Sequence, residues 1–437
     1  MIIIIGAGPV GLTVGKEVRS QYLIIEKEKK LGGLCQSYKF EGCTFDCGGH
    51  ALFTKNPKVE DYILTPMNGN IFTQQRRAFV ASYNQLIPYP YQSHLFNLPM
   101  DVKLDCLEGL LQCKENLIES PSLMEWLKAK FGIGIFNHFL GPYNRKVWAY
   151  PIEKIFPEWA QTRIVKPKIR QIIAGAIENR EFKEFDNFIV KYPLHGGFFG
   201  FFESLAKANK DYVVQDEVTS IDVLRKIVTL ASGKKIRYTQ LVSSIPLNQL
   251  LKISQNIPNQ IKDNGRYLEH NSLYLINLVA RRVGLKNIQR LYSADSNIVF
   301  HKLVFNGRSS PSTCNDRGWE PIQAEVSFSK YKLIDSNNLI DTFINNLLNL
   351  NVLIERSDIE NLEVRKISYA YPIIMKNTQK IREELRVFFF NHDIHIGGRF
   401  GEWIYINSDS AVERGLAIAK SINTEESRLV VNIEESV

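Results

Sequence analysis

Three glycines near the start of the chain have the spacing of a loop that binds the diphosphate of a dinucleotide. Gly6, Gly8 and Gly11 directly follow the β-branched run Ile2–Ile5, which predicts a buried parallel strand. Gly6 permits a tight turn, Gly8 lets backbone amides approach phosphate oxygens, and Gly11 lets a helix from Pro9 pack closely on the strand. The N-terminus of that helix favours an anion.

An acidic residue and a second glycine pair make this pattern more specific. The segment 22–25 predicts a second buried strand, which ends in Glu26, 20 residues after Gly6. A carboxylate there accepts both hydroxyls of an adenosine ribose and repels a 2′-phosphate. Gly32 and Gly33 follow, as in the companion motif of FAD enzymes of the glutathione-reductase type. The alternative is a Rossmann-like unit with an ordinary glycine turn.

A third group of candidate residues lies between positions 43 and 50. Cys43, Cys47 and His50 are spaced like metal ligands, but a structural zinc site needs four ligands, and no second pair has a suitable spacing. We therefore predict no metal. The adjacent Gly48 and Gly49 instead let the backbone press against a planar ring, with the His50 imidazole beside it as donor or acceptor.

Two later segments are predicted to complete the cofactor site. Residues 216–233, including Val218, are similar to the excursion by which FAD enzymes return to the adenine. Residues 394–403 predict a strand followed by glycines and Arg399, before a helix start near Asp409. This turn offers amides to the other end of a flavin. No second strand-led Gly-x-Gly-x-x-Gly and no Cys-x-x-Cys occurs, so the flavin itself must carry any chemistry.

Composition limits the remaining classes of function. The 437 residues predict about three structural units, and no apolar run approaches the roughly 20 residues of a membrane-spanning helix. The net charge is +8, but the basic residues are dispersed among acidic ones, which disfavours nucleic acid as a partner. Six cysteines without a leader indicate a reducing, cytoplasmic location.

The elements that must position these motifs predict an α/β fold. We expect an FAD-binding Rossmann-like domain of the glutathione-reductase type, an inserted helical domain and a second, mixed or antiparallel sheet. Helical periodicity covers 104–118, 122–140 and 339–350. Strands are expected at 188–192, 212–218, 226–230, 240–244, 272–279 and 299–305. The predicted domains are 1–94 and 376–437 for the cofactor, 95–187 for the helical insert, 188–270 for the return to the cofactor domain, and 271–375 for the substrate sheet.

Taken together, these motifs resemble the UDP-galactopyranose mutases, especially their eukaryotic-type branch, within the amine-oxidase and protoporphyrinogen-oxidase-like flavoproteins. The resemblance spans nearly the whole chain. Its most specific segments are FDCGGHALF (45–53), IPYPYQSHL (87–95), GPYNRKVWAYPIEKI (141–155), VKYPLHGGFFGFFESLA (190–206) and GGRFGEWIY (397–405).

The resemblance implies FAD that is active in its reduced form, and a nucleotide diphosphate sugar as substrate. In the family, N5 of the reduced flavin attacks the anomeric carbon of the pyranose and expels the nucleotide diphosphate. The sugar opens and recloses as a furanose, and the nucleotide then returns. An external reductant is implied, with NAD(P)H as the candidate, but no nucleic acid, no membrane insertion and no particular oligomeric state.

The resemblance also implies roles for individual residues. Arg163 is the first cation for the diphosphate, Tyr292, Tyr371 and Tyr405 donate hydrogen bonds to it, and His50 lies beside the flavin N5. Residues implied near the substrate are Tyr89, Tyr91, Gln92, Tyr143, Asn144, Trp148 and Asn187. Residues implied at the flavin are Gly49, Val218, Arg399, Asn407 and Ser408, with the glycines, Pro9 and Glu26 described above. For each tyrosine, ordinary packing is the alternative.

Lys302 departs from the family pattern. It occupies the position of a second arginine, and a lysine keeps the charge but lacks the planar fork that holds two phosphate oxygens. Either another cation such as Arg308 serves, or the diphosphate is bound differently.

Two other functions compete with the mutase. One is a net oxidase or desaturase of a non-sugar substrate, since the wider superfamily contains such enzymes. The other is a nucleotide- or flavin-binding module without catalysis, for which the change at Lys302 is the argument.

Overall fold

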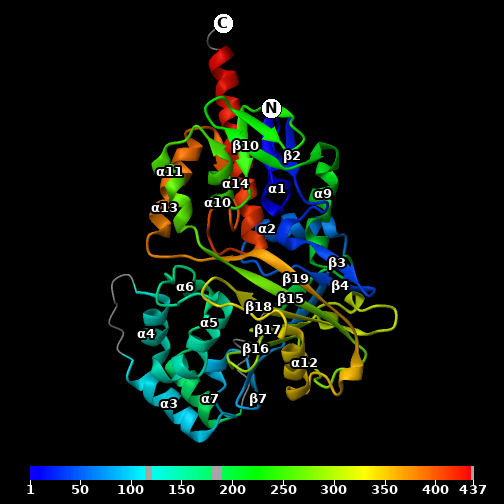
Figure 1. Ribbon diagram of the computed structural model, residues 1–437, viewed down its shortest axis with the longest axis vertical. Helices are drawn as coiled ribbons and strands as arrows, with labels where there is room; N and C mark the ends of the chain where they lie inside the picture. Colours follow the sequence, from blue (N-terminus) through cyan, green and yellow to red (C-terminus); the bar gives the residue numbers. More distant parts are fainter. Residues whose placement is uncertain (114–120, 180–188, 435–437) are drawn as a thin grey trace.

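The computed structural model describes residues 1–113, 121–179 and 189–434. Figure 1 shows a unit at the top that contains the N-terminus and the last helix, a large sheet across the middle, and a helical region at the lower left. The α/β fold predicted from the sequence is confirmed.

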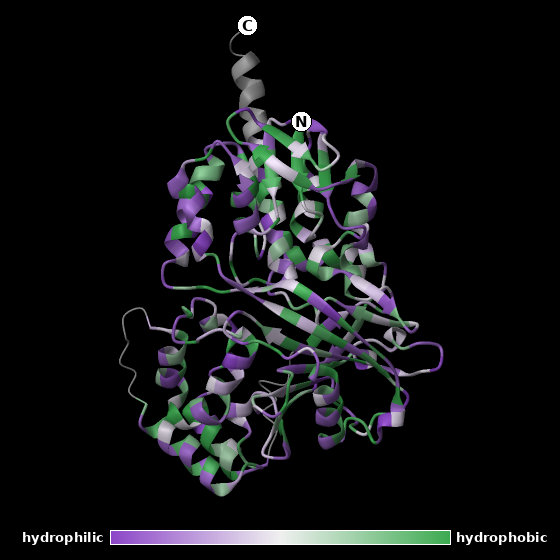
Figure 2. Ribbon diagram, viewed as in Figure 1, coloured by the Kyte–Doolittle hydropathy of each residue, from purple (hydrophilic) through white to green (hydrophobic). Residues whose placement is uncertain are grey.

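A five-stranded parallel sheet forms the core of the upper unit. Its order is β20 (Ile394–Ile396), β13 (Gln240–Ser243), β1 (Ile2–Ile5), β2 (Tyr22–Glu26) and β9 (Val213–Gln215). One face packs on α1 (Pro9–Glu17), α9 (Glu203–Asn209) and α14 (Ser408–Glu434), and the other packs on α10 (Leu247–Ile253) and α13 (Thr378–Phe390). Because both faces are covered, the central strand β1 is apolar throughout and β2 is apolar up to its terminal Glu26, and Figure 2 shows much green in this unit.

A smaller four-stranded sheet lies beside this unit. Its order is β12 (Lys235–Arg237), β11 (Ile227–Leu230), β10 (Val218–Asp222) and β14 (Ser254–Gln255). The prediction of a single strand over 212–218 is wrong, because β9 and β10 are separate strands in different sheets. The chain leaves the parallel sheet at Asp216, whose carboxylate accepts a hydrogen bond from the Glu217 amide.

The large sheet has seven strands and is antiparallel except between β16 and β6. Its order is β19 (Ile359–Pro372), β15 (His270–Ala280), β18 (Glu320–Phe328), β17 (Lys302–Phe305), β16 (Arg290–Ser293), β6 (Ala78–Ser82) and β7 (Gln85–Pro88). Helix α12 (Leu339–Asn349) covers one face. The strand predicted from 299 begins only at Lys302, because the Val299 amide donates to Asn346 of α12. The predicted domain boundaries stay predictions.

Two further sheets each consist of a pair of short antiparallel strands. β3 (Ser37–Phe40) pairs with β4 (Cys43–Asp46), and β5 (Phe72–Gln75) pairs with β8 (Ile189–Tyr192). Helix α2 (Pro57–Leu64) lies between them along the chain and packs under the parallel sheet.

The helical region contains α3 (Met100–Leu111), α4 (Leu123–Ile135), a π-helical turn over Phe136–Leu140, α5 (Gly141–Trp148), α6 (Ala160–Arg163) and α7 (Ile169–Ile177). Ser122 starts α4 with a capping box, in which its hydroxyl accepts from the Glu125 amide. The helix predicted over 104–118 begins earlier, at Met100, and the part beyond residue 113 lies outside the described residues.

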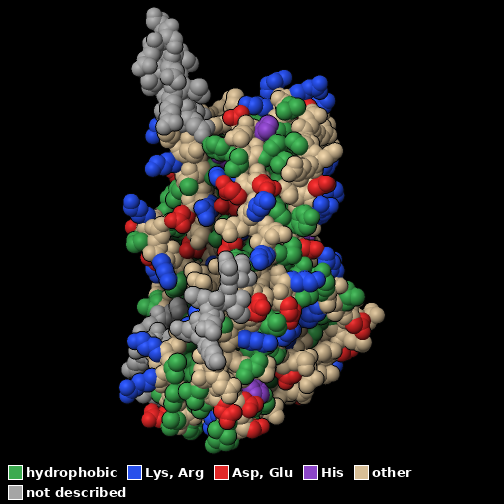
Figure 3. Space-filling model, turned by 90° about the vertical axis from the view of Figure 1, so that its left-hand side faces the viewer, with side chains coloured by type: hydrophobic (Ala, Val, Ile, Leu, Met, Phe, Trp, Pro, Cys, Tyr) green, Lys and Arg blue, Asp and Glu red, His purple; other side chains and the backbone are tan. Residues whose placement is uncertain are grey.

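Figure 3 shows basic side chains spread over one face among acidic ones, in keeping with the dispersed charges of the sequence. None of the helices in the described ranges combines the length and the hydropathy that a bilayer-spanning segment requires.

Candidate active site

The loop between β1 and α1 has the backbone that its glycines require. Gly6 has a φ of +96°, in the left-handed region that disfavours side chains. A Cβ on Gly11 would lie 2.0 Å from the carbonyl oxygen of Gly6, so only glycine lets α1 begin this close to β1. A Cβ on Gly8 would meet no described atom within 4 Å, so the space in front of the first turn of α1 is open to a ligand.

The second glycine pair lies directly against this loop. The Gly32 amide donates to the Ala7 carbonyl at 2.8 Å, and a Cβ on Gly33 would lie 3.4 Å from the Gly8 Cα. The two glycine motifs therefore meet at one point.

Glu26 stands at the end of β2 on the same side. Its carboxylate is 8% exposed and accepts hydrogen bonds from the Ala7 amide at 2.7 Å and the Glu28 amide at 2.8 Å. The Asp216 amide donates to the main-chain carbonyl of Glu26 at 3.1 Å, so the segment before Val218 returns to the end of β2.

The C-terminal turn completes the loop cluster. Cβ atoms on Gly397 and Gly398 would lie 3.0 and 3.1 Å from methyl groups of Val10, in the first turn of α1. Arg399 donates to the Ile406 carbonyl at 2.9 Å, and its guanidinium lies over the Tyr405 ring at 5.4 Å. The glycine loops from both ends of the chain thus surround the start of α1.

His50 lies on the side of the cluster that faces the large sheet. Its ring stacks on Phe198 with centroids 4.8 Å apart. Burial, together with the charges of Lys302 and Arg399, lowers the pKa of His50 to about 3, so the ring is neutral near pH 7. Its Nδ1 is buried without a hydrogen-bond partner among the described residues.

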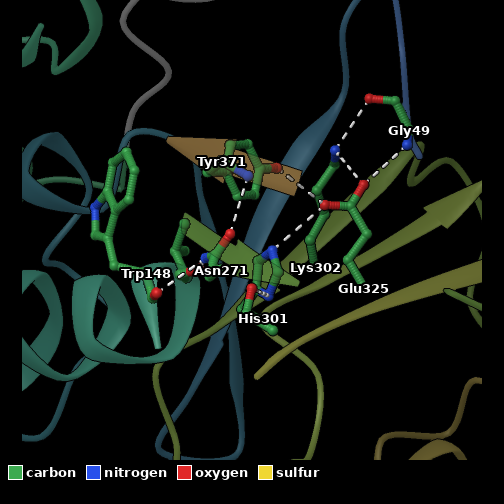
Figure 4. A network of polar contacts seen from close by, with 9 residues as sticks. Gly49, Trp148, Asn271, His301, Lys302, Glu325 and Tyr371 are labelled. Atoms are coloured by element: carbon green, nitrogen blue, oxygen red, sulfur yellow. Dashed lines mark hydrogen bonds and ion pairs between the residues drawn. The ribbon is translucent and has the colours of Figure 1, made fainter. Parts of the chain in front are cut away.

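Glu325 of β18 connects the His50 turn to the large sheet, as Figure 4 shows. Its Oε1 accepts from the Gly49 amide and from the Lys302 Nζ, both at 2.8 Å. Its Oε2 lies 3.3 Å from His301 Nε2 and accepts from the Tyr371 hydroxyl at 3.5 Å. Burial opposes ionisation, but Lys302 and His301 outweigh it and hold the pKa of Glu325 well below its usual range.

Five partly exposed tyrosines line the wall beyond this network, at positions 89, 143, 292, 371 and 405. Their rings contact one another or Trp148 at centroid distances between 5.6 and 6.0 Å. Arg76 lies 4.9 Å from the centre of the Tyr89 ring. Although burial opposes ionisation, the Arg76 and Arg290 charges hold the pKa of Tyr292 below its ordinary value, so the wall is electropositive.

Arg163 closes the wall from the helical region. At the end of α6, it donates to the Asn407 side chain at 2.7 Å and to the Tyr405 carbonyl at 3.5 Å, and it lies over the Tyr405 ring at 5.0 Å. Gln92 is 3% exposed and donates to the Val165 carbonyl at 2.6 Å, which fixes the segment that follows Arg163.

Helix α5 is oriented by side-chain hydrogen bonds. Asn144 donates to Leu140 and accepts from the Trp148 indole at 3.1 Å. Asn271 of β15 donates to the Val147 and Trp148 carbonyls at 2.9 Å and accepts from the Tyr371 amide (Figure 4).

This geometry matches known flavoproteins. Residues 4–64 match the family model described as an NAD(P)-binding Rossmann-like domain. A crystal structure of a reduced UDP-galactopyranose mutase matches with a TM-score of 0.90 and 25% identity, over 96% of this chain and 95% of that chain. The chain has the fold of the UDP-galactopyranose mutases. The resemblance stated from the motifs is confirmed, and its eukaryotic-type branch stays a prediction.

More distant structures share the fold alone. A putative protoporphyrinogen oxidase from Exiguobacterium sp. 255-15 matches with a TM-score of 0.73 at 13% identity, over 97% of this chain and 98% of that one. A putrescine oxidase bound to putrescine matches with a TM-score of 0.64 at 15% identity, over 96% and 98%. These likenesses, with the mutase fold, support a flavin-dependent enzyme.

The cofactor is FAD, as the sequence predicts. The described residues fit it: the open space before Gly8 suits a diphosphate, and the Glu26 carboxylate lies beside the same loop. At the other end of the cluster, the unpartnered Nδ1 of His50 and the Gly397–Gly398 turn face the remaining part of the site.

Most of the residues implied by the mutase resemblance come together, but several do not. Tyr91 is fully buried and stacks on Phe139 in the helical core. Asn187 lies outside the described residues. Arg308, the alternative second cation for the diphosphate, donates to the Leu285 and Ile288 carbonyls and lies 3.6 Å from Glu320. These partners hold its guanidinium away from the tyrosine wall.

Three residues of the site were not predicted from the sequence, namely Glu325, Arg290 and Asn271. The signal for Glu325 was the alternation of polar and apolar residues in IQAEVSF (322–328), which is typical of a strand with one polar face. For Arg290 it was the position two residues before Tyr292, on the same face of the strand.

Proposed function

We propose that the protein interconverts the pyranose and furanose forms of a nucleotide diphosphate sugar, as a UDP-galactopyranose mutase does. The observation that carries the proposal is the contact of Arg163 with Tyr405 and Asn407, on a wall of partly exposed tyrosines next to the His50 turn. Cations and phenols suit a diphosphate leaving group, which must be held without being lost.

The protein's own residues have three tasks in this reaction. Arg163 and the hydroxyls of Tyr292, Tyr371 and Tyr405 bind the departing diphosphate and keep it near the sugar. Trp148, held by Asn144, packs beside Tyr371 and Tyr405 and excludes water. His50, which is neutral near pH 7, donates or accepts a hydrogen bond at Nδ1 without adding charge. Reduced FAD, when bound, supplies the nucleophilic nitrogen for the anomeric carbon.

The acid–base character of the wall favours this reaction over amine oxidation. The buried carboxylate that the described wall contains, Glu325, is already paired with Lys302, so the arginines Arg76, Arg163 and Arg290 set the local charge. A cationic amine would be repelled there, whereas a nucleotide diphosphate is attracted. The shared fold with oxidases keeps net oxidation as the competing outcome of the test.

The test is an anaerobic incubation of the dithionite-reduced protein with UDP-galactopyranose and a panel of other nucleotide pyranoses. We expect a furanose product by anion-exchange chromatography and NMR, and none with the oxidised protein. Absence of any furanose, with reduced flavin verified by its spectrum, contradicts the proposal. Bleaching of oxidised flavin by an amine or another non-sugar substrate favours the oxidase.

A further inference from the structure

Lys302 forms its polar contacts on the cofactor side of the site, with Glu325 and the backbone of Gly49. On β17 it faces Tyr292 of β16 and Glu325 of β18, which are its cross-strand partners. Its Nζ donates to Glu325 at 2.8 Å and to the Gly49 carbonyl at 3.0 Å, while the Gly49 amide donates to the same carboxylate oxygen. The ion pair therefore holds both backbone groups of Gly49, and its positive charge is neutralised within the protein.

Arg290 lies on the same face of the large sheet. It stands two residues before Tyr292, and Leu291 between them packs into the opposite core against α12. Its cross-strand neighbours are Val304 and Ala78, which are small and uncharged.

The Arg290 guanidinium is directed towards the tyrosine wall. It is within hydrogen-bonding reach of the Tyr292 hydroxyl, and its charge acts on His50 as well. Within the described ranges, no carboxylate forms an ion pair with Arg290, in contrast to Lys302. Tyr292 in turn contacts Tyr89 at 5.6 Å and Tyr143 at 6.0 Å, so Arg290 borders the wall that Arg163 closes from the other side.

We propose that Arg290, and not Lys302, is the second cation that binds the diphosphate of the substrate. The inference rests on the proposed function and names the residue that binds its anionic group. A guanidinium can contact two phosphate oxygens at once, which a lysine at 302 cannot do. Lys302 is a positioning residue, which holds the Gly49–His50 turn through Glu325.

Binding of UDP and of inorganic pyrophosphate to the oxidised, FAD-loaded protein tests this without turnover. Isothermal titration calorimetry of Arg290→Met should show affinity for both probes reduced about 10- to 100-fold, with an unchanged flavin spectrum. Arg290→Lys should recover part of the loss. The matched control is Arg77→Met, because Arg77 is exposed and bonded to Asn287, and it should bind as the wild type does.

Lys302→Met should give the opposite pattern. We expect UDP affinity within about 3-fold of the wild type, but a shifted flavin absorption spectrum and midpoint potential, because the turn at Gly49 loses its tether. If the unpaired Glu325 prevents folding, the double variant Lys302→Met, Glu325→Gln keeps the site neutral and serves instead.

The outcomes separate the two proposals. Wild-type affinity in Arg290→Met, a UDP loss in Lys302→Met equal to that of Arg290→Met, or no binding of either probe to the wild type overturns the inference. If Arg290→Met weakens UDP binding as expected but the wild type forms no furanose, the inference stands and the proposed reaction fails.

Discussion

The candidate site has two walls of different composition: a cofactor wall made of glycine loops, and a facing wall made of tyrosine and arginine side chains. On the cofactor wall, glycines bring backbone groups close together, as at Gly6, Gly11 and Gly33. On the facing wall, tyrosines and arginines from the large sheet and the helical region supply rings and charges. Where backbone groups touch, as at Gly11, the cofactor wall has no room for an added Cβ. On the facing wall, each substitution should remove one side-chain contact at a time. The variants below test this difference.

The largest effect is expected where the backbone wall is tightest. Gly11→Val would place its Cβ 2.0 Å from the Gly6 carbonyl, so α1 must move away from β1. We expect a destabilisation of more than about 4 kcal/mol and loss of flavin, measured by thermal unfolding and by the ratio of absorbance at the flavin band to that of the protein. Gly8→Ala is the matched control, since it meets open space and should fold. A stable, yellow Gly11→Val protein would contradict the packing described for α1.

Removing one cation from the side-chain wall should leave the fold intact. Arg163→Ala is expected to raise the barrier to turnover by ~2–4 kcal/mol, because one preorganised contact to the leaving group is lost. Flavin content and melting temperature should stay near those of the wild type. Arg163→Lys, which keeps the charge, should lose less. A wild-type rate in Arg163→Ala would show that the leaving group binds elsewhere.

At Glu26, a side chain supports the backbone of the cofactor wall, because its carboxylate accepts hydrogen bonds from two backbone amides. Glu26→Ala should weaken FAD binding by about 1–3 kcal/mol, since the buried Ala7 amide loses its acceptor. Equilibrium dialysis against FAD measures the change. Glu28→Ala, an exposed neighbour, is the control and should bind FAD normally. Full flavin occupancy of Glu26→Ala at low FAD would rule out the ribose assignment.

Near neutral pH, the smallest effect on stability comes from protonation of His50, which lies between the walls. The pKa of His50 is about 3 in the folded protein, against an ordinary histidine value of 6.5, so the unfolded chain binds the extra proton first. Stability should therefore fall as the pH drops from 6.5 towards 3, by up to about 1.4 kcal/mol per pH unit from this residue. Chemical unfolding across this range should show a shallower slope for His50→Asn. His195→Asn, at an exposed histidine, should keep the wild-type slope; equal slopes in all three proteins would contradict a buried, neutral His50.

The comparison of the walls also explains what the sequence could predict. The loops at Gly6–Gly11 and Gly32–Gly33 are local, and each glycine spacing has a backbone reason that is visible in the sequence. Their mutual contact is non-local, but it follows from the order of adjacent parallel strands β1 and β2.

The tyrosine and arginine wall could not be predicted in the same way, because it depends on strand pairings that no local sequence pattern specifies. Lys302 meets Glu325 because β17 and β18 are neighbours in a particular register, and a shift of one residue would turn either side chain to the α12 face. β18 and β19 were not predicted, so neither the Glu325 network nor the ion pair of Arg308 with Glu320 was predicted.

The contact between Val10 and the Gly397–Gly398 turn has a consequence for synthesis of the protein. The first turn of α1 leaves the ribosome almost four hundred residues before its partner does. During translation the contact between the N-terminal loop and the C-terminal turn cannot form until the C-terminal turn has been synthesised. Until then, the apolar strand β1 lacks part of its final packing. A chain truncated before residue 397 would lack part of the flavin site, so flavin retention distinguishes complete molecules from prematurely terminated ones.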